Sequence, residues 1–418
     1  MLCLKQVISM KNIMKNKSMM LILLCWLVYT CSYIGKLSYN ANINQIGTIY
    51  NVNYSQTGMV STFFFFVYGI GQVINGICCK KYNVKYVIFG SLLTASLMNL
   101  LVAIVPSFSI IKYLWLINGA AMSFLWTSLI RLLSETLPKK DISKAIMLMG
   151  TTVATGTFLV YGLSAFFVAF ADFKITFYVA ASIMTIVALI WLIFFNKLVN
   201  PLKEERQIEL SEKKVLQEVK QNGKLGLLFV ILAFFATANN FIKDGLTAWT
   251  PDILSSLYET PGWLSILLTL FLPVLAIGGT ALAVNLHKKI KDFVGLCTVL
   301  YSVSCVLLIL VIVFISTSLL PITISCFALI SCLMAGVNNI ITSMVPLNMQ
   351  EKLNSGKLAG ILNGFCYLGS TLSSYGLGLI ADNWGWDSVF ITLLIVIIGV
   401  LGIGVNYLLY QKFVKRGI

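Results

Sequence analysis

Long apolar segments recur along the whole chain and are separated by short polar connections. Each holds about 18 or more nearly uncharged residues, which as a helix is enough to cross a hydrocarbon core of roughly 30 Å. In lipid the polar backbone can be satisfied only within helices or closed barrels, and runs of this length indicate helices. The sequence therefore predicts an all-α membrane protein with twelve transmembrane helices: 19–44, 55–78, 84–106, 111–136, 142–170, 173–196, 226–257, 262–286, 293–315, 319–348, 355–381 and 387–410.

A polar stretch near the middle of the chain divides these segments into two groups of six. Residues 197–222 interleave acidic and basic side chains, which predicts a cytoplasmic linker with a short surface helix over about 206–219. The remaining units follow from this division. They are a basic N-terminal tail (1–18), an N-terminal six-helix bundle (19–196), a C-terminal six-helix bundle (223–411) and a cytoplasmic tail (412–418).

The two groups of six repeat each other at a fixed offset. Lys144 and Gly156 in the fifth segment match Lys357 and Gly369 in the eleventh, each 213 residues later. Parallel six-helix repeats around a site near the membrane midplane are typical of the major facilitator architecture. We therefore expect two pseudo-symmetric six-helix halves.

The formal net charge of +15 raises the question of a nucleic-acid partner, and the placement of the charge argues against one. Of the 30 Lys and Arg residues, 26 lie in the tails or in connections on one predicted side of the membrane. Only Lys112 and Lys174 lie at the opposite connections, and the other two are Lys36 and Lys243. Because cytoplasmic loops carry the excess of basic residues, both termini are predicted in the cytoplasm. We expect a multi-pass protein of the plasma or inner membrane. Its excess of Lys and Arg residues marks the cytoplasmic side of the membrane.

Motifs for other classes of protein do not appear in the sequence. No GxxxxGK[ST] motif is present, so we do not expect an ATP-driven pump. The ten cysteines form no CxxC or Cys/His metal pattern and are interpreted as small apolar packing residues. No cleavage site follows the first apolar segment, which is therefore predicted to be an uncleaved anchor. We expect neither an enzyme nor a cofactor.

Two lysines stand inside apolar segments, one in each half of the repeat. Lys36 lies in the first segment and Lys243 in the seventh. A charge at membrane depth is costly and by default indicates a functional site. Two like charges held by two halves of one fold predict an anion between them.

Polar residues share helix faces with these lysines. Spacings of three and four residues place side chains on one face of a helix. By this rule four inward-facing stripes are predicted: Tyr29, Tyr33, Lys36 and Asn40; Tyr68 and Gln72; Asn240, Lys243 and Thr247; Asn363, Tyr367, Ser370 and Ser374.

Each assignment has a structural alternative. Tyr and Asn side chains can serve only as hydrogen-bonding contacts between helices, and Lys36 can extend its ammonium to the surface. Lys243 can instead be neutralised by Asp244 or Asp252. Consecutive side chains point about 100° apart on a helix, so a direct Lys243–Asp244 pair is not expected, and Asp252 is more than two turns away.

Several motifs resemble those of the organophosphate:phosphate antiporters. The run Lys243-Asp-Gly245-Leu-Thr-Ala-Trp249-Thr-Pro251 resembles their seventh-helix Arg-x-Gly-x-x-x-Trp-x-Pro, and Tyr33-Ile-Gly-Lys36 resembles their first-helix Tyr-x-x-Arg. The run from Leu358 to Gly369, followed by Gly385-Trp386-Asp387, is similar to their eleventh and twelfth helices. The resemblance covers essentially the whole chain. The Tyr-x-x-basic pattern is also shared with anion:cation symporters of hexuronates.

The resemblance implies a set of substrate-binding residues and some departures from the family. Lys36 and Lys243 stand where the family has two phosphate-gripping arginines, Gln72 replaces a lysine and Thr152 a histidine. Lysine is a compact point charge without the bidentate fork of arginine, so a carboxylate, sulfonate or phosphonate becomes nearly as plausible as a phosphomonoester. The predicted substrate-binding set is Lys36, Lys243, Tyr29, Tyr33, Tyr68, Gln72, Tyr367, Asn363, Asn240 and Thr152.

Gating residues are expected at two places. The connection between the second and third segments keeps Gly76 and Lys81 of the family signature, but Lys80 occupies the place of its aspartate. Asp244 is one of only two carboxylates at membrane depth, with Asp252. We therefore assign gating or coupling roles to Asp244, Gly76 and Lys81, and we expect a group other than the family's aspartate to close the inner gate.

The resulting expectation is a monomeric secondary transporter in the lipid bilayer. It would exchange a small anionic substrate for a counter-anion by rocker-switch alternating access. One alternative is an anion:proton symporter of sugar acids or other carboxylates. A second, from a different class, is a transport-like membrane sensor that binds the ligand and signals to a partner.

Overall fold

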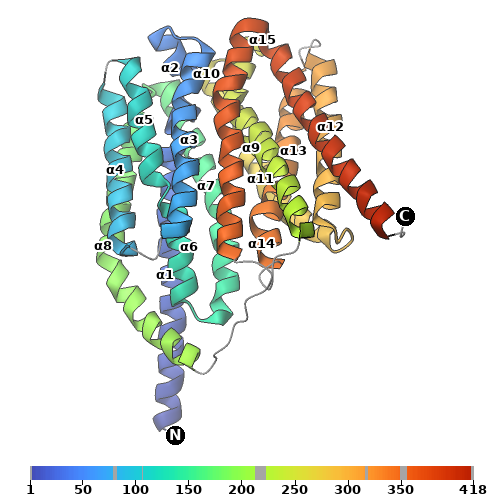
Figure 1. Cartoon of the computed structure of the whole chain (residues 1–418). Coiled ribbons are helices and arrows are strands. Elements are labelled where there is room, and N and C mark those ends of the chain that lie inside the picture. Colours follow the sequence, from blue (N-terminus) through green and yellow to red (C-terminus); the bar gives the residue numbers. More distant parts are fainter. Residues whose placement is uncertain are drawn as a thin grey trace.

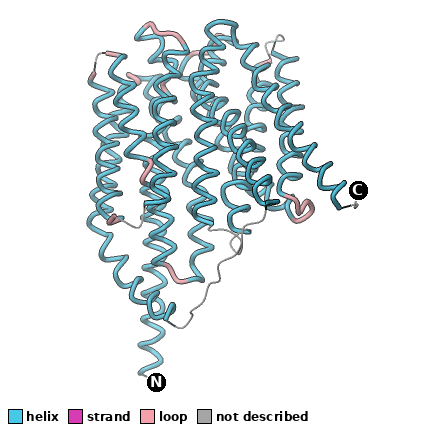
Figure 2. Tube along the Cα trace, viewed as in Figure 1, coloured by secondary structure: helices cyan, strands magenta, loops and turns pink. Residues whose placement is uncertain are grey.

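The computed structural model describes residues 2–78, 82–105, 107–211, 223–315, 319–348 and 355–415. Within these ranges there is no strand, and helices are joined by short loops (Figure 2). Eleven of the described helical segments are long and apolar enough to cross a membrane. The all-α prediction is therefore confirmed for the described part of the chain.

The first half of the chain forms six crossings. The fourth crossing is broken between α5 and α6 at Ser123 and Phe124, and α8 continues well into the predicted linker. Helix α1 likewise begins within the predicted N-terminal tail. The elements are α1 (Leu2–Ala41), α2 (Ile43–Tyr50), α3 (Tyr54–Cys78), α4 (Val84–Ile104), α5 (Phe108–Met122), α6 (Leu125–Thr136), α7 (Lys139–Phe170) and α8 (Lys174–Ser211).

The second half repeats this plan. Its second crossing is broken at Leu270, because Pro273 has no N–H to donate to the carbonyl of Thr269. A π-helical turn interrupts the fourth crossing at Ile340–Met344. The elements are α9 (Gly223–Tyr258), α10 (Gly262–Thr269), α11 (Phe271–His287), α12 (Phe293–Phe314), α13 (Leu320–Asn339), η3 (Ile340–Met344), α14 (Val345–Asn348) and α15 (Ser355–Lys415).

Helix α15 contains two crossings joined by a sharp reversal. Its backbone leaves the helical conformation at Gly385, where φ is +76° and ψ is 175°. Figure 1 shows the chain running up one limb of α15 and down the other. With this reversal the eleven apolar segments make the twelve predicted crossings.

Figure 1 places the N-terminus, the C-terminus and the ends of the central connection on one side of the molecule, which we call the terminal side. We call the opposite side, where α15 reverses, the distal side. The first six crossings pack into one bundle and the last six into another. The bundles meet mainly where α3 packs against α15 and where α7 packs against α10 and α11.

Glycines allow α3 and α15 to approach closely across the interface between the halves. A Cβ atom on Gly58 would lie 2.1 Å from the carbonyl oxygen of Ser374. A Cβ atom on Gly378 would lie 2.6 Å from the carbonyl oxygen of Tyr54. Because the obstacles are backbone atoms, a side chain at either position would force the helices apart.

The positive-inside pattern predicts that the terminal side faces the cytoplasm. A reporter fused after residue 418 and a tag inserted within 212–222 should both report cytoplasmic locations in intact cells. Twelve crossings require both sites to lie on the same side of the membrane. Opposite locations for the two sites would contradict the topology.

The reversal in α15 should tolerate only glycine. Gly385→Ala places a side chain at a φ/ψ combination that is essentially restricted to glycine, at a cost of about 1–3 kcal/mol. Nothing lies within 4 Å of the added Cβ, so the cost comes from the backbone alone. We expect a lower melting temperature for the purified protein. Gly399→Ala, in the same helix and equally open, is the matched control and should be neutral or stabilising.

Candidate functional site

The ammonium group of Lys36 lies in a cage of aromatic rings between the two halves. Lys36 is 5% exposed, and its Nζ donates a hydrogen bond to the Tyr367 hydroxyl at 3.2 Å. A cation within about 6 Å of a ring centroid is attracted by the ring quadrupole. Five rings meet this distance from Nζ: Tyr68 at 4.1 Å, Tyr367 at 4.8 Å, Tyr33 at 5.0 Å, Phe64 at 5.8 Å and Phe65 at 5.8 Å.

Three helices build this cage, and they come from both halves. Tyr33 lies one turn before Lys36 on α1, Phe64 and Tyr68 lie one turn apart on α3, and Tyr367 comes from α15. Among the described residues, no carboxylate lies within 4 Å of the Lys36 ammonium. Because Lys36 is only 5% exposed, the alternative that its ammonium extends to the membrane surface is wrong. Its charge is held at the interface by ring faces and one hydroxyl group.

Lys243 is paired directly with its neighbour in the sequence, contrary to the prediction. Its Nζ lies 3.3 Å from Oδ1 of Asp244, and both side chains are 22% exposed. The 100° offset between consecutive helical positions does not prevent the pair, since the four-carbon stem of lysine can curl back to the adjacent side chain. Asp252 is not the partner of Lys243: it is 2% exposed, and its Oδ1 accepts from Asn44 Nδ2 at 2.9 Å.

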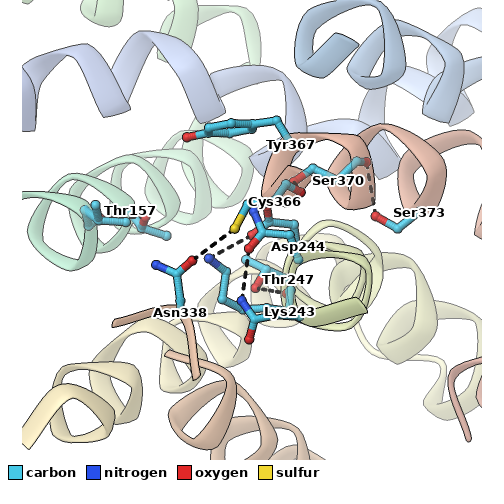
Figure 3. A network of polar contacts seen from close by, with 12 residues as sticks. Thr157, Lys243, Asp244, Thr247, Asn338, Cys366, Tyr367, Ser370 and Ser373 are labelled. Carbon is cyan, nitrogen blue, oxygen red and sulfur yellow. Dashed lines mark hydrogen bonds and ion pairs between the residues drawn. The ribbon is translucent and has the colours of Figure 1, made fainter. Parts of the chain in front are cut away.

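Asp244 is held in place by two further donors. Its Oδ2 accepts hydrogen bonds from Ser370 Oγ at 2.5 Å and from Asn240 Nδ2 at 3.0 Å. The Asn240 amide also donates to Ser370 Oγ at 3.1 Å. Figure 3 shows Asp244 between Lys243 and the helix that carries Tyr367 and Ser370. One carboxylate oxygen thus faces the lysine, and the other is fixed by neutral donors.

The two lysines are connected through α15. Tyr367 accepts the hydrogen bond from Lys36, and Ser370, about one turn further along, donates to Asp244. We call the connected set Lys36, Tyr367, Ser370, Asn240, Asp244 and Lys243 the lysine–aspartate network. It links a cation of the first half to a cation of the second.

Other residues predicted for the site take varied positions. Tyr29 is buried behind the cage, with its ring 5.4 Å from Tyr33 and 4.7 Å from Trp126. Gln72 is buried one turn beyond Tyr68, and in the described structure neither of its amide atoms has a hydrogen-bond partner. Such an orphaned polar group is the kind that a ligand or water can satisfy.

The remaining predicted residues are not members of the lysine–aspartate network. Thr152 is buried, but its hydroxyl donates to Met149 O of its own helix at 2.5 Å, so its hydrogen is already used. Asn363 is half-buried one turn before Tyr367. Gly76 is half-buried near the end of α3. Lys81 lies outside the described residues.

The sequence reasoning missed two cage residues, Phe64 and Phe65. They lie within a run of four phenylalanines that reads as lipid-facing apolar sequence. A usable signal was present, because they precede Tyr68 by four and three residues and therefore share its helix face.

The distal side is closed by contacts between the halves. The carboxylate of Asp382, at the end of the first limb of α15, accepts from the backbone N–H groups of Tyr54 at 2.9 Å and Ser55 at 2.7 Å. It thereby satisfies free donors at the start of α3 across the interface. Further contacts join the halves here: Asn44 to Asp252 and Ser255, Tyr54 Oη to Ser256 Oγ, Tyr161 Oη to Thr247 O, and packing of the Tyr54, Trp249 and Trp386 rings.

Twelve crossings in two repeated bundles, with a polar network where they meet, define a membrane transporter rather than an enzyme. Residues 25–373 match the profile of the Major Facilitator Superfamily, and the chain belongs to this family. The predicted architecture is thereby confirmed. The protein is a multi-pass membrane protein of this transporter class.

Similar proteins agree with this assignment. The chain is 22% identical to a probable hexose phosphate transport protein of Chlamydia muridarum, over 81% of this chain and 80% of that protein. It is 20% identical to the membrane sensor protein UhpC of Escherichia coli K12, over 89% and 88%. Among solved structures, a bacterial homologue of the human lysosomal transporter Spinster, in an inward-facing, unoccupied conformation, superposes with a TM-score of 0.73 at 13% identity, covering 96% of this chain and 98% of that one. The last comparison supports the fold alone.

The Tyr367 hydroxyl should stabilise the Lys36 ammonium. Tyr367→Phe keeps the ring but removes the acceptor, and a buried polar group left without a partner costs about 1–3 kcal/mol. We expect a lower melting temperature for the purified protein without ligand. Tyr375→Phe, in the same helix and half-buried, is the matched control and should change little. Equal shifts in the two variants would show that the hydrogen bond contributes nothing specific.

Proposed function

We propose that this protein is a secondary carrier of a small organic anion, which it moves by alternating access between its two halves. The observation that supports this most directly is the Lys36 ammonium, buried at the interface with no carboxylate among its described contacts. Holding a cation there is costly unless a charge of opposite sign compensates it. An anion entering between the halves supplies that charge.

The position of the second cation supports the same function. Lys243 comes from the other half and is partly exposed, so its ammonium can contact a ligand while remaining near Asp244. A lysine ammonium has three donors, and Lys36 uses one of them on Tyr367. The free donors of the two lysines can bind one anionic group between the halves.

This arrangement favours exchange over free movement of the empty carrier. Closing the halves without ligand leaves the Lys36 ammonium in a low-dielectric space, because the carboxylate of Asp244 is paired with Lys243. A bound anion offsets this cost and lowers the barrier to switching. The carrier then changes orientation only when loaded, which is exchange of one anion for another.

The similarity to a hexose phosphate transport protein supports an anionic substrate, organophosphate-like or carboxylate. Proton symport with a sugar acid is the first alternative. It is less favoured because Asp244 and Asp252, the carboxylates at depth, are both engaged in hydrogen bonds. The similarity to a membrane sensor supports the second alternative, in which the ligand binds but is not transported.

We place the carrier in the plasma or inner membrane, with its terminal side in the cytoplasm. In the described structure contacts join the halves on the distal side, which would favour exchange of ligand with the cytoplasm in this state. Opening to the outside then requires the distal contacts of Asp382 and Asp252 to break.

Counterflow in proteoliposomes tests the proposed function. Vesicles loaded with unlabelled glucose 6-phosphate, phosphate or glucuronate should take up the labelled anion without a pH gradient. Lys36→Gln should reduce apparent affinity about 30-fold or more while the protein stays folded, because truncating a charged partner of a buried contact costs about 2 kcal/mol or more. Lys112→Gln, outside the site, is the control.

The results separate the alternatives. Uptake that depends on a pH gradient would favour symport, and binding without flux would favour a sensor. Wild-type exchange rates in Lys36→Gln would contradict the site. Lys243→Gln alone leaves the Asp244 carboxylate without its cation. The double variant Lys243→Gln/Asp244→Asn removes both charges of the pair and should therefore be measured beside the single variant.

A further inference from the structure

The lysine–aspartate network carries three ionisable side chains. Lys36 and Lys243 each have a formal charge of +1 and Asp244 has a formal charge of −1, so the formal charge of the described network is +1. Lys36 is joined to the other two through Tyr367 and Ser370, which lie about one turn apart on α15. Asp252 belongs to the distal contacts and is bound to Asn44.

Asp244 is built into the site as a fixed carboxylate. Every described contact of its side chain is with a cation or a donor: Lys243 Nζ, Ser370 Oγ and Asn240 Nδ2. Ser370 belongs to α15, so the carboxylate is held from two helices. Its position is therefore set by the packing of α9 against α15 and does not depend on an exposed, mobile side chain.

We propose that Asp244 is an internal counter-anion that restricts the substrate to a single negative charge. The substrate class is then a monoanion, such as a carboxylate, a sulfonate or a sulfate ester, in preference to a phosphate-ester dianion. This inference rests on the proposed function, since it concerns the ligand of the same site.

The preference for a monoanion follows from how two free energies depend on the charge of the ligand. Doubling the charge of a ligand doubles its attraction to a site of fixed net charge, whereas the cost of removing the ligand from water rises with the square of its charge. A monoanion neutralises a site of charge +1, but a dianion leaves one buried negative charge uncompensated. Removing Asp244 raises the site to +2, which matches a dianion.

The magnitude is large enough to measure. At an effective dielectric constant of about 20 and a separation of roughly 5 Å, one additional charge interaction corresponds to on the order of 100-fold in affinity. Asp244→Asn should therefore shift the affinity ratio of dianion to monoanion by on the order of 100-fold. A tenfold change in this affinity ratio is enough to distinguish the proposed role of Asp244 from the absence of such a role.

The experiment uses ligands that differ only in charge. Glucose 6-sulfate and glucose 6-phosphate share the sugar and a tetrahedral anionic group, as do glycerol 3-sulfate and glycerol 3-phosphate. At pH 7.5 the sulfates are monoanions and the phosphates mostly dianions, because the second phosphate pKa is about 6. Binding to the full-length protein is measured by thermal shift, and exchange by counterflow, with glucuronate as a further monoanion.

Wild type should bind the sulfate ester more tightly, and Asp244→Asn should reverse this order. Asp244→Glu, which keeps the charge, should retain the wild-type order. Asp387→Asn removes a carboxylate from the exposed distal end of the same half and is the matched control, with no change in the ratio. The same ratio in wild type and Asp244→Asn would overturn the inference.

A test on wild type alone covers the case in which the variants do not fold. Between pH 7.5 and pH 5 the phosphate ester gains a proton and becomes a monoanion, while the sulfate ester keeps its charge. Binding of the phosphate ester relative to the sulfate ester should rise at least tenfold, and a constant or falling ratio would overturn the inference. If anions bind but the ratios do not follow charge, only the role of Asp244 fails. If no anion of either charge binds or exchanges, the proposed function fails with it.

Discussion

The burial of one ammonium group between two helical bundles is the constraint on which the rest of the site depends. Lys36 can remain charged at membrane depth only if its surroundings replace water. The structure provides aromatic faces and the Tyr367 hydroxyl, and both halves contribute them. These groups stabilise the cation without neutralising it. The charge therefore stays available to a ligand, which a carboxylate partner would have prevented.

Helix α15 carries residues of both the lysine–aspartate network and the distal contacts. Tyr367 accepts a hydrogen bond from Lys36 and Ser370 donates one to Asp244, and Asp382, three to four turns further along the same helix, caps the start of α3. Under the proposed function, a ligand that displaces Tyr367 relative to Lys36 would also displace the limb of α15 that carries Asp382. Binding at the network and the distal contact would then be coupled.

Much of the fold follows from the sequence, because the length of an apolar run is dictated by the thickness of the bilayer. Lys36 and Lys243 stand out in the sequence for a similar reason, since a charge inside such a run is conspicuous. The Lys243–Asp244 pair was not predicted, because it depends on side-chain torsions that helical periodicity does not determine. The cage role of Phe64 also depends on packing between segments distant in sequence.

The free energy of the distal contacts is of the size that the binding of a ligand can supply. Each hydrogen bond contributes a net 0.5–1.5 kcal/mol or so, and those to the charged Asp382 about 1.5–3 kcal/mol. Shifting a two-state equilibrium from 1:99 to 99:1 requires about 5.5 kcal/mol of differential binding. The summed free energy of a few such hydrogen bonds is of the same order as this differential binding free energy. A carrier and a sensor built on this network would use the same groups to hold a ligand. They would differ in how the free energy of the distal contacts compares with that of ligand binding.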